Sequence, residues 1–204
     1  GRGVPLFRVR GDRHSGPGVD PAVVRTAPVT LQACLNGGRP AGEPGARPAV
    51  PVTPAQLAEA AVAALAAGAD GLHLHQRDAA GRESLAPDDV AAAVTAVRDA
   101  VGPGVAVDVT TGLWAAPDAA ARHAMVTDWP VLPDAASVNW HEDGAVELAE
   151  LLLARGVGVD AGLWTVDAAV AFLGWERRGE VRRVLVEAVE DDGPAVACAE
   201  TLKL

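Results

Sequence analysis

The sequence has 204 residues, half of them hydrophobic, and a formal net charge of −10 at pH 7. This length suits one domain with a sizeable core, and the acidic balance argues against nucleic-acid binding, because phosphate contacts need a clustered cationic surface. No stretch approaches the roughly 20 apolar residues of a membrane span, and no secretory signal pattern stands near the start. The two cysteines, Cys34 and Cys198, lie outside any CxxC pattern, which is typical of a reducing, cytoplasmic compartment.

Residues 1–28 are rich in Gly, Pro and Arg and show no apolar period, so we expect an irregular tail there. Residues 29–204 form the expected folded domain. The C-terminal end stops inside a helix-like pattern without a capping glycine, and we therefore expect the chain to be a fragment.

From residue 29 onward, short β-rich runs alternate with helical patterns. The predicted strands are Val29–Leu35, Gly71–His75, Val105–Thr111, Ala136–Trp140, Val157–Ala161 and Arg183–Glu187. The clearest helix begins with Thr53 as N-cap, Pro54 in the first turn and Gln56 three residues after the cap, which is a capping-box pattern. Further helices are predicted from Pro87 to Gly102, around 146–152 up to Gly156, and over 166–176.

Alternating β and α segments with apolar strands predict a parallel sheet covered by helices. The turn after the first strand, Leu35–Pro40, lacks the G-x-G-x-x-G of a doubly wound dinucleotide-binding sheet. A barrel instead places polar residues at the C-terminal ends of many strands. Such residues are Asn36, His73, His75, Thr110, Thr111, Asn139, Asp160 and Glu187. We therefore favour an α/β fold, a (β/α) TIM-type barrel truncated to about six of the usual eight βα units.

His73 and His75 stand at positions i and i+2 of one strand, so their side chains share a face and lie roughly 7 Å apart along the chain. Two neutral imidazoles at a barrel mouth suit Zn²⁺, and other divalent ions also fit such a pair. The alternative is that both are hydrogen-bonded core residues. The remaining histidines (His14 in the tail, His123 in a helix and His141 in a loop) are expected at the surface.

Other polar positions have two interpretations each. Thr110, Thr111 and Gly112 could bind a carboxylate or oxyanion, or form a plain strand end with a turn. Asn139 could orient a substrate or cap its loop, and Glu187 could be a metal ligand, a general base or half of an ion pair. For Arg77 and Asp78, which follow the histidine strand, we favour a structural pair over a role in orienting His75.

Several motifs occur together in one order: Ala33–Gly37, Pro48–Pro54, His73–Asp78, Thr110–Gly112 and Ala136–Trp140. In these the chain resembles the β-keto acid cleavage enzymes. The resemblance implies a zinc-dependent barrel that condenses a β-keto acid with acetyl-CoA, giving acetoacetate and a new CoA thioester. It also implies a homo-oligomer.

Carried over by position, the resemblance makes His73 and His75 two zinc ligands, and Thr110 a hydroxyl that acts near the substrate, with Thr111 and Gly112 completing its turn. Ser137 and Asn139 match substrate-binding positions on the fourth strand. The family's carboxylate ligand belongs to a G-[LF]-E-D motif on an eighth strand, and nothing after Glu187 matches it.

Two positions bear on the substrate. Arg39 and Gly162 stand where family members that act on amino-bearing keto acids carry acidic groups, and Asp160 is the remaining inward acid of the fifth strand. With Asn36, these residues form the expected substrate set, and they predict a non-aminated β-keto acid, with an anionic one allowed. Two alternatives stay open: an inactive truncated barrel, or another metal-dependent barrel lyase or hydrolase that uses the same two histidines.

Overall fold

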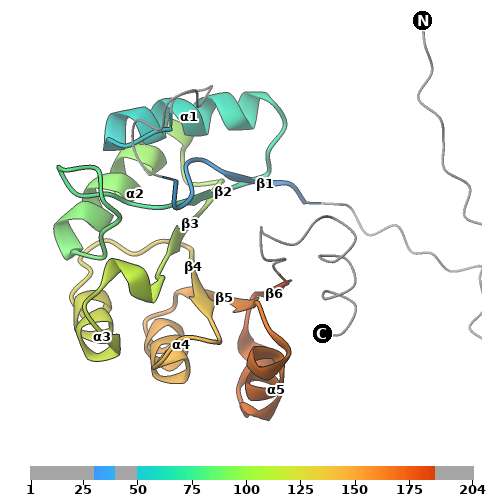
Figure 1. Ribbon diagram of the computed structural model, residues 1–204. Helices are drawn as coiled ribbons and strands as arrows, with labels where there is room; N and C mark the ends of the chain where they lie inside the picture. The colour runs from blue at the N-terminus through green and yellow to red at the C-terminus, as the bar shows by residue number, and fades with distance from the viewer. Residues whose placement is uncertain (1–29, 40–49, 187–204) are drawn as a thin grey trace, which may run out of the picture.

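The computed structural model describes residues 30–39 and 50–186. Within them, six parallel strands pair in the order β1-β2-β3-β4-β5-β6 and alternate with helices, curling into a half-barrel (Figure 1). The predicted α/β, partial TIM-type barrel is therefore confirmed. Glu187, the predicted tail and part of the Pro48–Pro54 motif lie outside the described residues. The strands are β1 Gln32–Cys34, β2 Gly71–Leu74, β3 Ala106–Thr110, β4 Ala135–Asn139, β5 Gly158–Leu163 and β6 Arg183–Val186.

Four of the described helices begin and end close to where the sequence signals predict, and α3 is the helix in which the sequence analysis placed His123 without giving bounds. The helices are α1 Pro54–Ala66, α2 Pro87–Val101, α3 Ala119–Thr127, α4 Ala145–Ala154 and α5 Val166–Gly174, with short 3₁₀ turns η1 Leu113–Ala115 and η2 Arg178–Glu180. The capping box of α1 is confirmed, since the Thr53 hydroxyl accepts from the Gln56 amide at 3.2 Å and Gln56 Oε1 accepts from the Thr53 amide at 3.0 Å.

Side chains alternate between the two faces of each strand. Leu72 and Leu74 of β2 and Val107 and Val109 of β3 are fully buried in the core that the outer helices share (Figure 1). Each such side chain contributes about 1.5–3 kcal/mol to stability when fully buried. The intervening residues face the inside of the curved sheet, which is why the polar side chains gather there.

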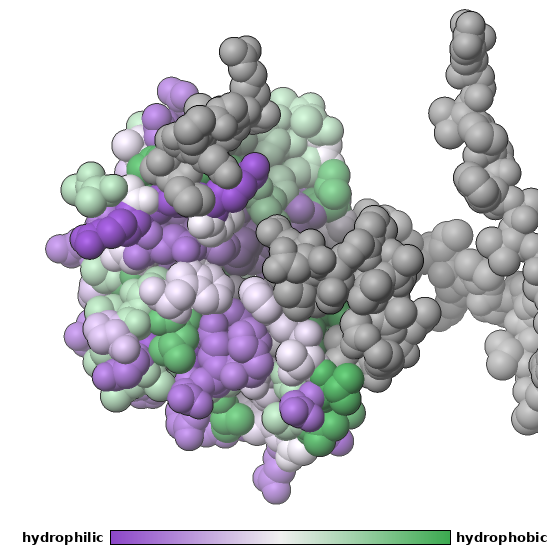
Figure 2. All heavy atoms as spheres, in the orientation of Figure 1, coloured by the Kyte–Doolittle hydropathy of each residue, from purple (hydrophilic) through white to green (hydrophobic). Residues whose placement is uncertain are grey.

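Apolar burial is less complete at the far edge. Val184 and Val186 of β6 are 43% and 41% exposed, and α5 exposes Val170 and Leu173. In Figure 2, apolar surface is visible at the lower right of the coloured part of the molecule, which is where Figure 1 places α5. None of the described helices is both long and apolar enough to cross a membrane.

Candidate active site

A cavity of about 600 Å³ opens at the C-terminal ends of the strands. The residues that line it include His73 in β2, His75 directly after β2, Thr110 at the end of β3, and Ser137 and Asn139 in β4. The parallel register explains the gathering, because Thr110 pairs with Ser137 and the strands run in one direction. Five residues predicted separately from sequence thus share one cavity.

His73 lies on β2 next to His75, and burial changes its protonation. Burial, and then the neighbouring His75, lower the pKa of its imidazole to about 3. The two rings lie edge to face with their centres 5.3 Å apart. His73 is therefore a neutral imidazole at physiological pH, the form that binds a metal ion.

The backbone of His75 is fixed by Asn36. The His75 amide donates to Asn36 Oδ1 at 2.8 Å, and Asn36 Nδ2 donates to the His75 carbonyl at 2.7 Å. Asn36 also donates to the Pro51 carbonyl at 3.2 Å and is almost completely buried. Asn36 does not line the cavity. Its hydrogen bonds instead hold the end of β1 against the end of β2.

The His75 ring contacts a residue that the sequence interpretation missed. Its Nδ1 lies against Glu83 Oε1, and Trp114 Nε1 donates to Glu83 Oε2 at 2.7 Å. Although burial raises the pKa of Glu83, the hydrogen bonds from His75 and Trp114 bring it below its ordinary value. A usable signal was Gly81, a turn glycine at φ +79°, which folds the chain back so that Glu83 bridges to Arg77.

Arg77 and Asp78 do not form the structural pair that the sequence analysis favours, because each makes its contacts with other residues. The Arg77 guanidinium donates to the carbonyls of Gly81, Gly37 and Arg39 at 2.7–2.9 Å. Asp78 forms an ion pair with Arg82 instead of contacting His75. Arg39, predicted as a substrate-binding residue, is exposed and does not line the cavity.

The turn after β3 presents one hydroxyl to the cavity and uses the other internally. Thr110 Oγ1 accepts from the Gly112 amide at 3.3 Å and lines the cavity, whereas the Thr111 hydroxyl donates to the Ser137 carbonyl. A side chain at Gly112 would collide with the Trp114 indole, so this position requires glycine. The turn therefore orders the β3 and β4 ends relative to each other.

A buried ion pair that sequence reasoning did not find holds the Asn139 amide. Arg122 of α3 pairs with Glu142, with both side chains almost fully buried, and also donates to the Asp143 carbonyl. Glu142 Oε1 in turn accepts from Asn139 Nδ2 at 2.9 Å. A Cβ at Gly162 would lie 2.7 Å from Asn139 Oδ1, so the glycine makes room for this amide. The loop after β4 therefore supplies a buried anchor for Asn139.

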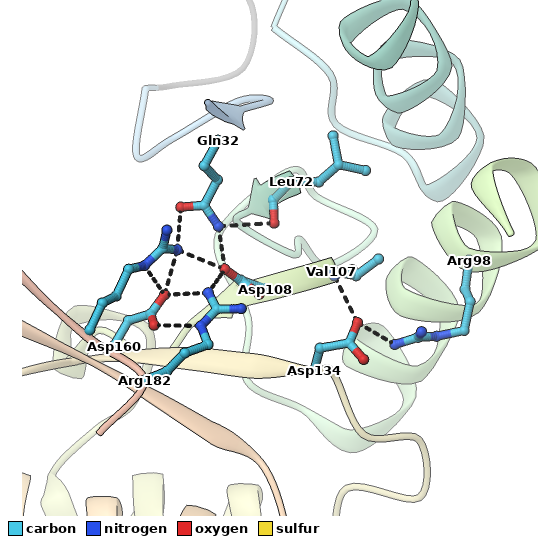
Figure 3. Close-up of polar contacts among 9 residues, drawn as sticks. Gln32, Leu72, Arg98, Val107, Asp108, Asp134, Asp160 and Arg182 are labelled. Atoms are coloured by element: carbon cyan, nitrogen blue, oxygen red, sulfur yellow. Dashed lines mark hydrogen bonds and ion pairs between the residues drawn. The ribbon is translucent and has the colours of Figure 1, made fainter. Parts of the chain in front are cut away.

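Asp160 belongs to a group of charged and polar side chains that we call the floor cluster: Gln32, Asp108, Asp160, Arg182 and Arg183 (Figure 3). Of these, Gln32 also lines the cavity. The Asp160 carboxylate accepts from both arginines at 2.6–2.9 Å and does not line the cavity. Burial raises the pKa of Asp108, against the opposing effect of the Arg182 hydrogen bond. Arg183 reaches Gln32 at 2.5 Å and so links β6 to β1.

Exposure agrees with expectation at the other described histidines. His123 in α3 and His141 after β4 are both exposed. Within residues 30–39 and 50–186, no three His, Cys, Asp or Glu side chains come together as a metal-binding group.

Comparison with known proteins bears directly on this arrangement. A model of the beta-keto acid cleavage enzyme family matches residues 28–155, which include β1 to β4 and every polar residue lining the cavity from those strands. The chain belongs to the beta-keto acid cleavage enzyme family. The resemblance noted in the sequence is thus confirmed.

A solved structure described as the apo structure of ObcA is similar to this family member with a TM-score of 0.52 and 18% identity. The match covers 71% of this chain and 38% of that one, so the chain spans well under half of the ObcA length. At this identity the likeness concerns the fold alone. No curated protein matches the chain.

Proposed function

We propose that this chain carries the metal- and substrate-binding half of a zinc-dependent β-keto acid cleavage enzyme, which condenses a β-keto acid with acetyl-CoA to give acetoacetate and a new acyl-CoA. The observation that carries the proposal is the shared cavity, in which paired histidines face hydroxyl and amide groups from two neighbouring strands. Family membership supports the reaction class.

The two histidines fit a zinc ion chemically. His73 is neutral, and His75 places Nδ1 against a carboxylate, which leaves Nε2 as the candidate ligand atom. A bound Zn²⁺ would act as a Lewis acid toward the keto oxygen and carboxylate of the substrate. Glu187 remains the proposed third ligand or general base.

The surrounding residues would bind and orient the keto acid. Thr110 Oγ1 already accepts the Gly112 amide, so its own O–H is free to donate to a substrate oxygen. Ser137 supplies a second hydroxyl in the cavity, and the amide of Asn139 is held in place by Glu142. Donors aimed at a developing oxyanion stabilise the transition state of an acyl transfer, so we assign Thr110 the catalytic role and Ser137 and Asn139 substrate binding.

The charge of the cavity wall favours a non-aminated substrate. Among the described residues that line the cavity there is no aspartate or glutamate. An ammonium group on the substrate would lose hydration there without gaining a carboxylate partner, which is costly. We therefore propose that the keto acid lacks an amino group. Thr111, Gly112, Asn36 and Asp160 would support this site from behind.

Metal content and acetyl-CoA-dependent turnover test the proposal together. We expect near-stoichiometric zinc, lost in His73→Ala and His75→Ala, and acetoacetate formed from a non-aminated keto acid in preference to its amino-bearing analogue. The exposed His123 provides the matched control, His123→Ala, which should keep both properties. Turnover that needs zinc but not acetyl-CoA would instead indicate another metal-dependent lyase or hydrolase. A folded wild-type protein that binds no zinc would overturn the proposal.

A further inference from the structure

We propose that Glu83 is the positioning residue of His75: its carboxylate fixes the tautomer and orientation of the imidazole and so presents Nε2 to the metal ion. The inference rests on the proposed function and assigns a role to a residue outside the motifs that carry the family resemblance. It follows from the contacts of three side chains, namely Glu83, His75 and Trp114.

The first step is the direction of the hydrogen bond. Glu83 Oε1 lies against His75 Nδ1, and both side chains are largely buried, with 13% and 14% of their surfaces exposed. An ionised carboxylate only accepts hydrogen bonds, so Nδ1 is the nitrogen that carries the proton. The other nitrogen then keeps its lone pair, and metal-binding histidines commonly show this carboxylate–imidazole arrangement.

The second step is the rigidity of the Glu83 backbone. The chain reverses after β2 in a tight hairpin, in which Ser84 N donates to the Gln76 carbonyl at 3.0 Å and Asp78 N donates to the Arg82 carbonyl at 2.8 Å. Arg77 fastens this hairpin to the carbonyls of Gly37 and Arg39. Because the hairpin continues directly from the histidine strand, Glu83 keeps a fixed position relative to His75.

The third step is the second oxygen of the carboxylate. Trp114 Nε1 donates to Glu83 Oε2 at 2.7 Å, and the Trp114 ring stacks on His75 with centres 6.5 Å apart and planes inclined by 21°. Glycine at 112 leaves the space that the indole occupies. Both oxygens of Glu83 therefore have a donor, and the carboxylate links the β2 end to the turn after β3.

The site has features that separate orientation from direct ligation. No group of three candidate ligands forms among residues 30–39 and 50–186, so Glu83 does not join the two histidines around a common centre there. Both of its oxygens already have a partner, Oε1 at His75 Nδ1 and Oε2 at Trp114 Nε1. Asp78, an acid in the same hairpin that pairs with Arg82, offers a matched control because it does not contact His75.

The test compares Glu83→Ala, Glu83→Gln, Trp114→Phe and the control Asp78→Asn. Zinc affinity is measured by chelator competition, and the His75 tautomer is read in the metal-free protein from the ¹⁵N shifts of its two ring nitrogens. Loss of an outer carboxylate typically lowers metal affinity about 10–100-fold. We expect this for Glu83→Ala, a smaller loss for Glu83→Gln, whose side-chain oxygen still accepts, and the smallest loss for Trp114→Phe. Asp78→Asn should match the wild type.

The tautomer separates this inference from the proposed function. The wild-type protein should carry the proton on Nδ1 of His75 without any metal present, and Glu83→Ala should lose this preference while keeping its far-ultraviolet spectrum and melting temperature. An Nε2-protonated His75 in the wild type, or equal zinc affinity in Glu83→Ala and Asp78→Asn, would overturn the role of Glu83. If the wild type binds no zinc, the proposed function fails, and the tautomer alone decides whether Glu83 orients His75.

Discussion

The inside of the half-barrel holds two polar layers with opposite character. At the mouth, His73, His75, Thr110, Ser137 and Asn139 line an open cavity. One layer deeper, the floor cluster joins two aspartates to two arginines in a set of mutual ion pairs (Figure 3). The two layers share β3, on which Asp108 stands two residues before Thr110.

The difference lies in where the hydrogen bonds go. In the floor cluster most hydrogen bonds run between charged groups: both oxygens of Asp160 and Oδ2 of Asp108 accept from arginine, and only Oδ1 of Asp108 has no partner among the described residues. At the mouth, hydroxyl and imidazole groups keep capacity that the described protein atoms do not use, and their cavity admits a ligand. Charged residues that neutralise each other stabilise the fold, whereas polar residues left facing a cavity are available for binding. The measurements below would break or sharpen this contrast.

The largest expected effect is on stability, at the floor. Asp160→Ala removes one of the two carboxylates that both arginines contact. Breaking a buried pair from one side typically costs about 3–5 kcal/mol, and the remaining pairs with Asp108 place the expected cost at or below the lower end of this range. We expect a loss of this order in the free energy of unfolding, measured by urea titration. Glu180→Ala breaks the exposed Arg177–Glu180 pair and should change stability far less. Equal effects of the two substitutions would contradict the structural role of the floor cluster.

The next effect concerns zinc at the mouth. His73→Ala removes one of two proposed ligands, and we expect zinc affinity to fall at least about 100-fold, which corresponds to about 2.7 kcal/mol. At neutral pH this substitution leaves no charge unpaired, so any loss of stability reflects lost packing alone. Isothermal calorimetry on the wild type and on His123→Ala provides the comparison. Unchanged zinc affinity in His73→Ala would show that His73 is not a zinc ligand and would contradict a metal site in this cavity.

The pH dependence of stability separates the layers in a third way. The pKa of His73 is about 3 in the folded protein and about 6.5 in the unfolded chain. Between pH 6.5 and pH 3, the imidazole is therefore protonated in the unfolded chain and neutral in the folded protein. The His73 contribution to stability is therefore constant above pH 6.5 and falls between pH 6.5 and pH 3, by up to about 1.4 kcal/mol per pH unit.

This slope is isolated by comparing the wild type with His73→Gln in metal-free buffer over that pH range. The difference between the two unfolding free energies should grow as the pH falls, with His73→Gln favoured at the acid end. Parallel curves would show that His73 titrates normally in the folded protein, and would place it in contact with solvent.

The smallest effect is on substrate binding. Ser137→Ala deletes one cavity hydroxyl, and a single hydrogen bond contributes about 0.5–1.5 kcal/mol, so affinity of the zinc-loaded protein for a non-aminated β-keto acid should fall severalfold. The exposed hydroxyl of Thr127, which donates to the His123 carbonyl, provides the control Thr127→Ala. Equal affinities in Ser137→Ala and the wild type would exclude Ser137 from the substrate site.

The sequence alone was sufficient for the fold and for much of the mouth. Alternation of apolar strands with capped helices predicts parallel strands with outer helices, because both signals are local in the chain. The i, i+2 spacing of His73 and His75 and the polar residues at strand ends predict a common cavity for the same reason. Strand geometry makes neighbours in sequence into neighbours on one face.

Tertiary structure decided which polar groups are available and which are already paired. Asp160 and Glu142 look like ordinary acids in the sequence, yet one pairs with arginines from the β6 region and the other with Arg122 of α3. Glu83 reaches His75 only because the hairpin at Gly81 reverses the chain. Such pairings depend on the closure of loops and on side chains from separate elements meeting in space, and neither residue type nor local spacing encodes that.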